Sequence, residues 1–393
     1  MMISQYSNTQ QSEFDCAVMI VGAGPAGISS WLHLQKYAPQ LARQSIVLEK
    51  AIFPRDKLCA GGLGAWCGEV LQHLEIELNI PSIYIADIDF RAAKEFYHFH
   101  QANCFRVVQR ADFDHALAQV AVNRGLELRE GEFLTNVTRN ARGLTVRTNK
   151  KKYNVQILIG ADGALSKVRR KMIPSSRPHL AATIQIFAPA DPHYDPEFNQ
   201  RKITLNLAPL SKGLQGYLWH VPCLKNGIPS MAHGIVDFRI YPGRPRADIK
   251  KIFRDELRSR NLKHEPESWS SYPICWFSEE YIISQPNILL VGDAAGVEPA
   301  LGGGIHIALS YGEVAAYTIM SAFQNNDFSL DDYTQRLYSH LAGRVLTENL
   351  HLALEMYGGK ENPLKILRRL FPQKKESPNL LSLFFSGASV KNH

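Results

Sequence analysis

The glycines near the start of the chain form a turn suited to binding phosphate. The run Gly22-Ala23-Gly24-Pro25-Ala26-Gly27 directly precedes a segment with helical spacing, 28–36. Gly22 permits a tight bend, Gly24 lets the backbone approach a pyrophosphate, and Gly27 lets helix and strand pack closely. The N-terminus of the helix adds free N–H groups and the positive end of its dipole. This turn is therefore predicted to bind the pyrophosphate of a dinucleotide.

An acidic residue supports the same prediction. The continuous apolar runs Cys16 to Val21 and Ser45 to Leu48 are typical of strands buried on both faces of a parallel sheet. Glu49 closes the second run, where a carboxylate can accept a hydrogen bond from a ribose hydroxyl. Alone, such a turn fits any α/β protein, but strand, helix and acid together favour a dinucleotide. No second complete fingerprint is visible, which favours one tightly held cofactor.

Two later strands end in similar turns. The run ILIG (157–160) is followed by Asp162 and Gly163, and NILLV (287–291) is followed by GDAAG, which contains Gly292 and Asp293. Pro299 and the run Gly302-Gly303-Gly304-Ile305 come next. With the N-terminal turn, these segments resemble the GADGxxSxVR and GDAAGxxxPxxGxGI motifs of FAD-dependent oxidoreductases of the para-hydroxybenzoate hydroxylase type. The resemblance implies that FAD is the cofactor.

The residue types of the third motif suit a flavin. Asp293 directly follows a strand, where its carboxylate can accept from a ribityl hydroxyl. The glycines 302–304 would let the backbone pass close to a flat ring and offer N–H groups to its electron-rich edge.

The segment after the first acid points to a narrower family. FPRDKLCAGGL (53–63) resembles the PxxKxCGGGL segment of the geranylgeranyl reductase family, with Ala60 inserted. Its glycines let backbone approach a flat group, and Lys57 offers a cation near a phosphate or the carbonyl edge of the ring. Cys59 is placed where a thiol could face the flavin. The alternative is a buried, inert cysteine.

Arg110 is expected to reach the cofactor from the start of a helix at 111–124. Its segment VQRADFD resembles the family element VxRxxFDxxL. The alternative is a surface arginine, with Asp112 and Asp114 acting as helix N-terminal charges. The predicted cofactor-binding residues are Gly22, Gly24, Pro25, Ala26, Gly27, Glu49, Lys50, Lys57, Arg110, Asp162, Gly163, Gly292, Asp293, Pro299, Gly302, Gly303, Gly304 and Ile305.

An aromatic pair is the expected wall of a substrate pocket. Tyr217 and Trp219, in GYLWHVP, are two residues apart on an expected strand and therefore point to one face. The segment resembles the YxWxFP motif of the reductases, with Val221 in place of phenylalanine, and more loosely the WxWxIP motif of flavin-dependent halogenases. Ordinary sheet core is the alternative. The candidate catalytic residues are Cys59, Tyr217 and Trp219.

Composition excludes several classes of protein. The chain has 393 residues, 45% hydrophobic and 21% charged, which excludes wholesale disorder. Its net charge of +7 is spread along the chain, so no nucleic-acid partner is expected. The six cysteines have no zinc spacing, and His98 and His100 share a strand face without a third ligand at sensible spacing. We therefore expect no metal and a reducing compartment. A cytoplasmic location is expected because the sequence shows neither a segment like a secretory signal peptide nor an apolar segment long enough to span a membrane.

The expected fold class is α/β: a Rossmann-like FAD-binding domain with an antiparallel-sheet substrate domain and a C-terminal helical segment. We place the FAD-binding domain at 1–84, 104–178 and 276–325, and the substrate domain at 85–103 and 179–275. The helical region is then 326–393. Its apolar and basic stretches, 364–371 and 380–385, could dock on an anionic membrane surface or pack as helix on the domain.

The leading functional hypothesis is an FAD-dependent oxidoreductase that reduces carbon–carbon double bonds of an apolar, isoprenoid-like substrate, lipid or otherwise. The alternative is an FAD-dependent monooxygenase acting on an aromatic substrate, including a protein-borne tryptophan during cofactor maturation. Halogenation is less favoured, because the lysine and GEATIP-type elements of tryptophan halogenases are not evident. A non-catalytic flavoprotein that binds a protein client is a third hypothesis. The electron donor is NAD(P)H, bound transiently, or another reductant.

Overall fold

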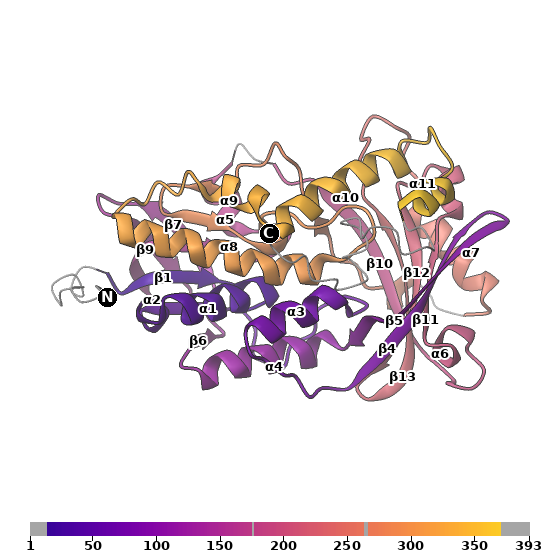
Figure 1. Cartoon of the computed structure of the whole chain (residues 1–393), viewed down its shortest axis with the longest axis horizontal. Helices are drawn as coiled ribbons and strands as arrows, with labels where there is room; N and C mark the ends of the chain where they lie inside the picture. Colours follow the sequence, from indigo (N-terminus) through magenta and orange to yellow (C-terminus); the bar gives the residue numbers. More distant parts are fainter. Residues whose placement is uncertain (1–13, 175–176, 263–265, 371–393) are drawn as a thin grey trace.

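The computed structural model describes residues 14–174, 177–262 and 266–370, and within them two large sheets stand side by side (Figure 1). The strands of the first sheet are β1 (Cys16–Val21), β2 (Ser45–Glu49), β6 (Glu127–Glu130), β7 (Leu134–Arg139), β8 (Leu144–Thr148), β9 (Lys152–Gly160), β15 (Ser284–Gln285) and β16 (Ile288–Leu290). Those of the second are β3 (Gly62–Gly64), β4 (Ser82–Ala92), β5 (Glu95–Val108), β10 (Leu180–Pro189), β11 (Lys202–Asn206), β12 (Gly216–Lys225), β13 (Ile228–Asp237) and β14 (Ile274–Cys275).

Strand register in the first sheet brings the three motifs to one edge. The order is β15-β16-β9-β1-β2-β6, and β1 runs parallel to both β2 and β9. Val21 pairs with Leu48 on one side and with Gly160 on the other, while Leu290 pairs with Gly160 from β16. The turns that follow these strands therefore lie next to one another, at the carboxyl edge where α/β sheets bind ligands.

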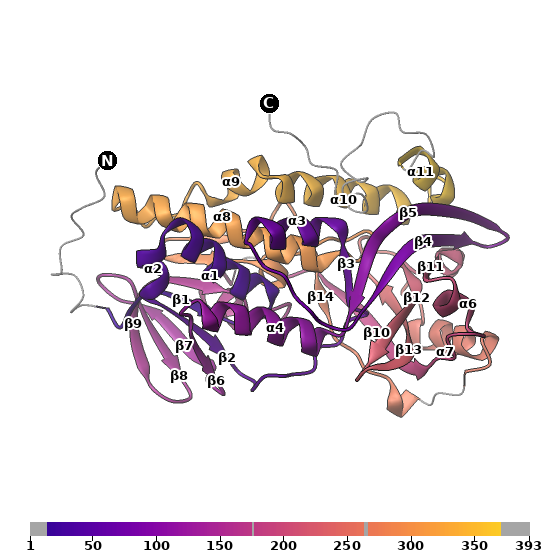
Figure 2. The ribbon, with the colours of Figure 1, turned by 60° about the horizontal axis from the view of Figure 1, so that its bottom comes forward.

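Helices cover the first sheet. They are α1 (Pro25–Tyr37), α2 (Pro39–Arg43), α4 (Arg110–Asn123), α5 (Lys167–Met172) and α8 (Gly304–Asn325). Helix α3 (Ala65–His73) packs beside α8 and contacts β3 and β5 of the second sheet. Helices α1 and α8 lie side by side (Figures 1 and 2). They cross closely because Gly312 has no side chain: a Cβ there would lie 2.5 Å from Ser29 Oγ. Ser29 Oγ also donates to the Leu309 carbonyl at 2.5 Å.

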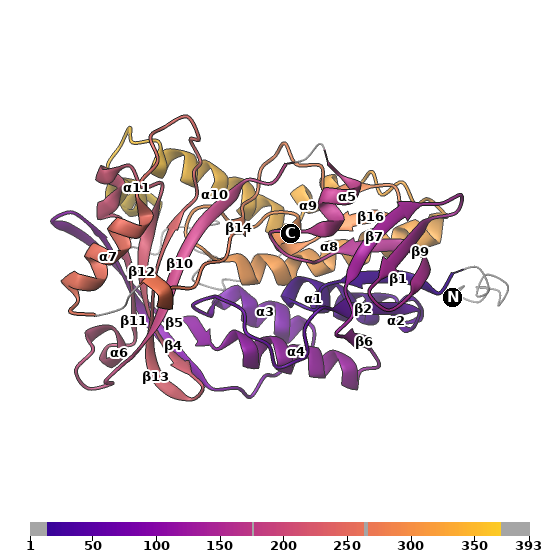
Figure 3. The same ribbon diagram turned by 180° about the vertical axis from the view of Figure 1, so that it is seen from behind.

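The second sheet separates its two faces by alternation. Its order is β14-β10-β13-β12-β11-β4-β5-β3, antiparallel except for the β11–β4 pair. One face packs Leu218 and Ile235 against α7 (Ile249–Ser259). Tyr217 and Trp219 alternate with Leu218 along β12 and belong to the other face, which turns toward the first sheet. The short helix α6 (Pro196–Asn199) packs beside β11 and β12, seen from behind in Figure 3.

The C-terminal helices join the two halves. They are α9 (Tyr333–Ser339), α10 (Leu341–Tyr357) and α11 (Pro363–Leu370), and α10 runs from beside α8 to the second sheet (Figure 2). Leu364, Ile366 and Leu367 are fully buried in the core cluster that includes β4 and β5. These side chains pack on the protein and do not form a membrane-docking face. Residues 371–393, with the expected 380–385 stretch, lie outside the described residues.

No helix within the described ranges combines the length and apolar character needed to cross a bilayer.

Candidate active site

A cavity of about 900 Å³ lies between the carboxyl edge of the first sheet and the inner face of the second. This volume is near the upper end of ligand sites, roughly 300–1,000 Å³. The predicted residues that line it are Gly22, Gly24, Pro25, Ala26, Glu49, Lys50, Lys57, Cys59, Arg110, Asp162, Gly163, Tyr217, Trp219, Asp293, Gly302, Gly303, Gly304 and Ile305. Gly27, Gly292 and Pro299 are not among the lining residues.

The first glycine turn fits a phosphate group. Gly22 has a φ of +108°, and a Cβ there would lie 2.3 Å from the Ala161 carbonyl oxygen. At Gly24 the nearest atom to an added Cβ is the Arg55 guanidinium at 3.8 Å, so the backbone is open on that side. Helix α1 begins at Pro25 with no acidic residue in its first turn and no side-chain cap. Its N-terminus is thus suited to an anion.

Two glycines outside the lining allow close packing behind the cavity. A Cβ on Gly27 would lie 1.9 Å from the Gly22 carbonyl oxygen, and one on Gly292 would lie 2.7 Å from the Cβ of Ala26. They therefore shape the turn from behind.

Arg55 joins two buried carboxylates beside the turn and was not predicted. Its Nε lies 3.3 Å from Glu49 Oε2, and its Nη1 lies 3.2 Å from Asp114 Oδ2. Glu49 also accepts hydrogen bonds from the backbone N–H groups of Ala23 at 3.1 Å and Ala51 at 3.0 Å. Glu49, the acid expected to bind the ribose, is thus held in place. Arg55 adds a positive charge close to the turn that is expected to bind the phosphates.

Arg110 is buried rather than at the surface, so the surface-arginine alternative is wrong. Its guanidinium donates to both carboxylate oxygens of Asp114, Nε to Oδ1 and Nη2 to Oδ2, each at 2.8 Å. Asp114 is therefore the common partner of Arg110 and Arg55. This paired arrangement orients Arg110 at the cavity wall.

The side chains of the second motif hold neighbouring segments in place around the site. Asp162 accepts from Ser166 Oγ at 2.5 Å and from the N–H groups of Lys167 at 2.6 Å and Val168 at 3.2 Å, which caps α5. Arg169, buried one turn later, donates to the Ala295 carbonyl at 3.2 Å. Because Ala295 belongs to the third motif, Arg169 links the two motifs.

Lys57 and Asp293 are oppositely charged residues that both line the cavity. Burial raises the pKa of Asp293, and the nearby charges of Lys57 and Arg110 oppose that shift. Burial lowers the pKa of Lys57 to about 8, and Asp293 opposes this shift in turn. Lys57 Nζ also lies 3.1 Å from the ring centroid of Tyr272, which the sequence did not single out. A cation and an anion are thus available here for a polar cofactor.

The glycine loop at 302–304 is held by a second unpredicted acid. Glu298 is buried, and its carboxylate accepts from the backbone N–H groups of Ala300, Leu301 at 2.8 and 3.0 Å, Gly302 at 2.5 Å and Gly303 at 3.0 Å. We expected the glycine N–H groups to face the flavin, but those of Gly302 and Gly303 bind Glu298 instead.

Tyr217, one of the aromatic pair, lies against the glycine loop. Tyr217 and Trp219 meet edge to face, with ring centroids 6.3 Å apart. A Cβ on Gly302 would lie 2.3 Å from Tyr217 Oη, so the second sheet closes directly on the cofactor loop. Cys59 lines the same cavity, and its Sγ accepts from the Gly61 N–H at 3.3 Å.

Comparison with known proteins identifies the cofactor. The family described as "FAD binding domain" matches residues 15–336. The chain is 27% identical to digeranylgeranylglycerophospholipid reductase 2 of Methanococcoides burtonii, covering 80% of this chain and 77% of that protein. It is 26% identical to menaquinone reductase of Mycolicibacterium smegmatis, covering 77% and 76%.

A solved structure has the same fold. It is a geranylgeranyl bacteriochlorophyll reductase-like protein from Thermoplasma acidophilum, with a TM-score of 0.73 and 20% identity over 94% of this chain and 95% of that one. The glycine turn and the held acid fit the pyrophosphate and the ribose of FAD. The chain therefore belongs to the FAD binding domain family, and it is an FAD-dependent oxidoreductase.

Proposed function

We propose that this enzyme reduces carbon–carbon double bonds of an apolar, isoprenoid-like substrate. The observation that carries the proposal is the apolar inner face of the second sheet, which forms one wall of the cavity. Its side chains include Ile88, Phe105, Ile203, Leu205, Val221 and Val236. Such a wall gains free energy by removing hydrocarbon from water, about 25 cal/mol per Å² of apolar surface.

The names of the relatives support the same class of substrate. Two of them are called reductases of lipids that carry isoprenoid chains. At 26–27% identity, they support a lipid substrate without identifying it.

The cavity residues have distinct roles in this proposal. Bound FAD, once reduced, supplies the hydride. Tyr217 and Trp219 hold the acceptor carbon against the flavin side of the cavity and exclude water. Addition across a double bond also needs a proton on the second carbon. Burial raises the pKa of Tyr217 well above its ordinary value, so its hydroxyl stays protonated, and Cys59 offers a thiol in the same cavity.

The cofactor would be held by the residues described above. The glycine turn and α1 bind the pyrophosphate, Glu49 binds the ribose, and Asp293 binds the ribityl chain. Lys57 and Arg110 balance negative charge.

Anaerobic turnover tests the proposal. The FAD-loaded protein is reduced with dithionite and mixed with a polyprenyl lipid, and in parallel with its fully saturated analogue. We expect the visible flavin absorption to return only with the unsaturated lipid, and the lipid mass to rise by two hydrogens per reduced bond. Absence of both changes with unsaturated lipids of several chain lengths would contradict the proposal.

The oxygen dependence of NAD(P)H oxidation distinguishes the monooxygenase alternative from the reductase. If an aromatic compound accelerates NAD(P)H oxidation only when oxygen is present, and the product gains an oxygen atom, the enzyme is an oxygenase. For the reductase, we expect lipid saturation to proceed without oxygen.

A further inference from the structure

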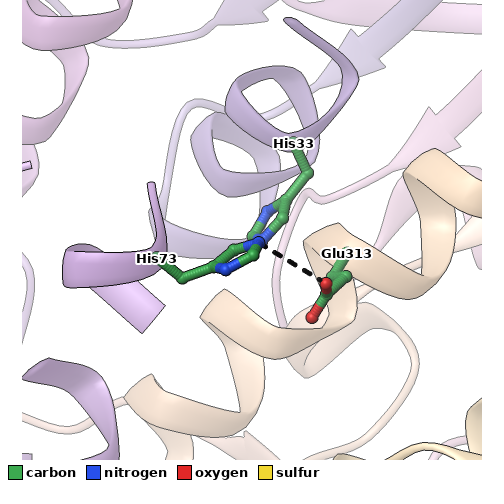
Figure 4. Close-up of side chains that lie close together, drawn as sticks. All are labelled: His33, His73 and Glu313. Carbon is green, nitrogen blue, oxygen red and sulfur yellow. Dashed lines mark ion pairs between the residues drawn. The ribbon is translucent and has the colours of Figure 1, made fainter. Parts of the chain in front are cut away.

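Three metal-ligand side chains from three helices meet away from the cavity. They are His33 of α1, His73 at the end of α3 and Glu313 of α8 (Figure 4). One ligand atom of each lies within 4.8 Å of the other two, and His73 Nε2 is 3.8 Å from Glu313 Oε1. None of the three lines the FAD cavity.

His33 is oriented as metal-binding histidines commonly are. Its Nδ1 lies 2.9 Å from the Ser29 carbonyl oxygen, which can only accept, so Nδ1 carries the hydrogen. Nε2 then carries the lone pair that is available to a metal ion. A ring nitrogen that donates to a backbone carbonyl is the usual outer contact of a metal-bound imidazole. The imidazole is buried and cannot readily turn away.

Glu313 is oriented by a fourth residue, His340. The Nδ1 of His340 accepts from the Ala342 N–H at 3.1 Å, so its other ring nitrogen, Nε2, carries the hydrogen. This Nε2 lies 3.2 Å from Glu313 Oε2 and donates to it. His340 therefore acts as a positioning residue that fixes the carboxylate and leaves Oε1 facing His73.

Tyr37 offers a competing explanation for the cluster. Its hydroxyl donates to Glu313 Oε1 at 2.7 Å and lies 2.5 Å from His73 Nε2. A hydrogen-bond network centred on this hydroxyl would hold the same groups together without an ion. The two explanations differ in whether the cluster has affinity for a cation.

We propose that His33, His73 and Glu313 bind one zinc ion, with water or the Tyr37 hydroxyl in the fourth position. Two imidazoles and one carboxylate form a zinc donor set, with bonds of about 2.0–2.2 Å. A tetrahedral arrangement at that length places ligand atoms about 3.4 Å apart. The present separations need only a small contraction, which His73 can supply because its side chain is 47% exposed at a helix end.

The position of the cluster gives the ion a structural role. His33, His73 and Glu313 lie eight, eight and nine residues after the first residues of their helices. At 1.5 Å per residue, each ligand is about 12–14 Å from the end that meets the cofactor site. Helix α1 follows the pyrophosphate turn, α3 follows the Cys59 loop, and α8 follows the flavin glycines. Zinc would therefore clamp the three helices that carry these loops.

The test uses zinc itself with the full-length, FAD-loaded protein. After chelator treatment and dialysis, ZnCl₂ is titrated by calorimetry, and FAD release is followed by fluorescence with and without zinc. We expect one zinc per chain at this cluster and slower FAD release. His73→Gln, at the exposed helix end, and Glu313→Gln should each weaken binding at least about tenfold.

A second histidine group provides the matched control. Asp87, His98 and His100 also bring ligand atoms within 4.8 Å of one another, on the exposed β4–β5 pair. The double variant His98→Asn/His100→Asn should leave zinc binding at the His33, His73 and Glu313 cluster unchanged. If this variant abolishes zinc binding while His73→Gln does not, the proposal is wrong.

Tyr37→Phe separates an ion site from a hydrogen-bond network. It removes the bridging hydroxyl but keeps the three ligands, so zinc should still bind within about tenfold of the wild-type affinity. If wild-type protein binds no zinc and Tyr37→Phe lowers its thermal stability, the cluster is a hydrogen-bond network and the zinc proposal falls.

Discussion

The indole of Trp219 occupies the place where a side chain of Gly234 would stand. The two residues are opposite each other in the β12–β13 register, and a Cβ on Gly234 would lie 2.1 Å from Trp219 Cζ2. Trp219 therefore leans across the neighbouring strand, and the aromatic wall of the cavity depends on a glycine as much as on the tryptophan.

Gly234→Ala should displace the indole and narrow the cavity. Overpacking of this kind costs typically about 1–3 kcal/mol. We expect a lower thermal midpoint and reduced turnover of the polyprenyl substrate, measured by calorimetry and by anaerobic flavin reoxidation. Gly243→Ala is the matched control, because nothing lies within 4 Å of its added Cβ. Equal behaviour of the two variants would contradict the prediction.

Arg55→Ala should weaken FAD binding. It removes the cation between Glu49 and Asp114, so two buried carboxylates lose a partner beside the expected phosphates. A hydrogen bond from Arg55 to a cofactor phosphate would be worth about 1.5–3 kcal/mol, so its loss corresponds to roughly a tenfold to hundredfold higher Kd. The Kd is measured by titrating the cofactor-free protein with FAD and following the fluorescence. Arg147→Ala, at an exposed position, should bind FAD as the wild type does.

Glu298→Ala should loosen the glycine loop. The substitution leaves the backbone N–H groups at 300–303 without their acceptor, and a buried unsatisfied donor costs about 1–3 kcal/mol. We expect faster FAD dissociation, followed by the recovery of free flavin fluorescence after dilution. Glu279→Ala, an exposed acid, serves as the control. A dissociation rate equal to that of the control would mean that the loop does not depend on Glu298.

FAD affinity should fall as the pH rises above about 8. Burial lowers the pKa of Lys57 to about 8 in the cofactor-free protein. A nearby anionic cofactor raises that pKa again, so binding takes up a proton above pH 8. Affinity is therefore greatest below pH 8 and falls above it, by at most about tenfold per pH unit.

Lys57→Met isolates this dependence. The variant should bind FAD more weakly and with a flatter profile between pH 8 and 10, because the neutral side chain cannot titrate. Lys250→Met, at an exposed position, should keep the wild-type profile. If Lys57→Met retains the full pH dependence, another group is responsible for it.

The turns and strands of this fold that depend on neighbouring residues can be predicted from the sequence. The glycine turn at 22–27 requires backbone freedom and close approach, and the strand that precedes it is apolar because both faces are buried. Alternation along β12 places Tyr217 and Trp219 on one face, as predicted. These features depend on residues within a few positions of one another, so short-range sterics and burial periodicity determine them. Three such motifs in order were enough to predict FAD.

Tertiary packing alone decided which distant side chains meet. Arg55 reaches Glu49 and Asp114 only because β2 and α4 converge on the same edge, and Glu298 turns back onto its own loop. The apolar residues of α11 bury against the second sheet, although their pattern also suited a membrane surface. His33 and Glu313 are far apart in the chain and meet because α1 crosses α8. Such contacts depend on strand register and helix packing across the whole chain, which no local pattern encodes.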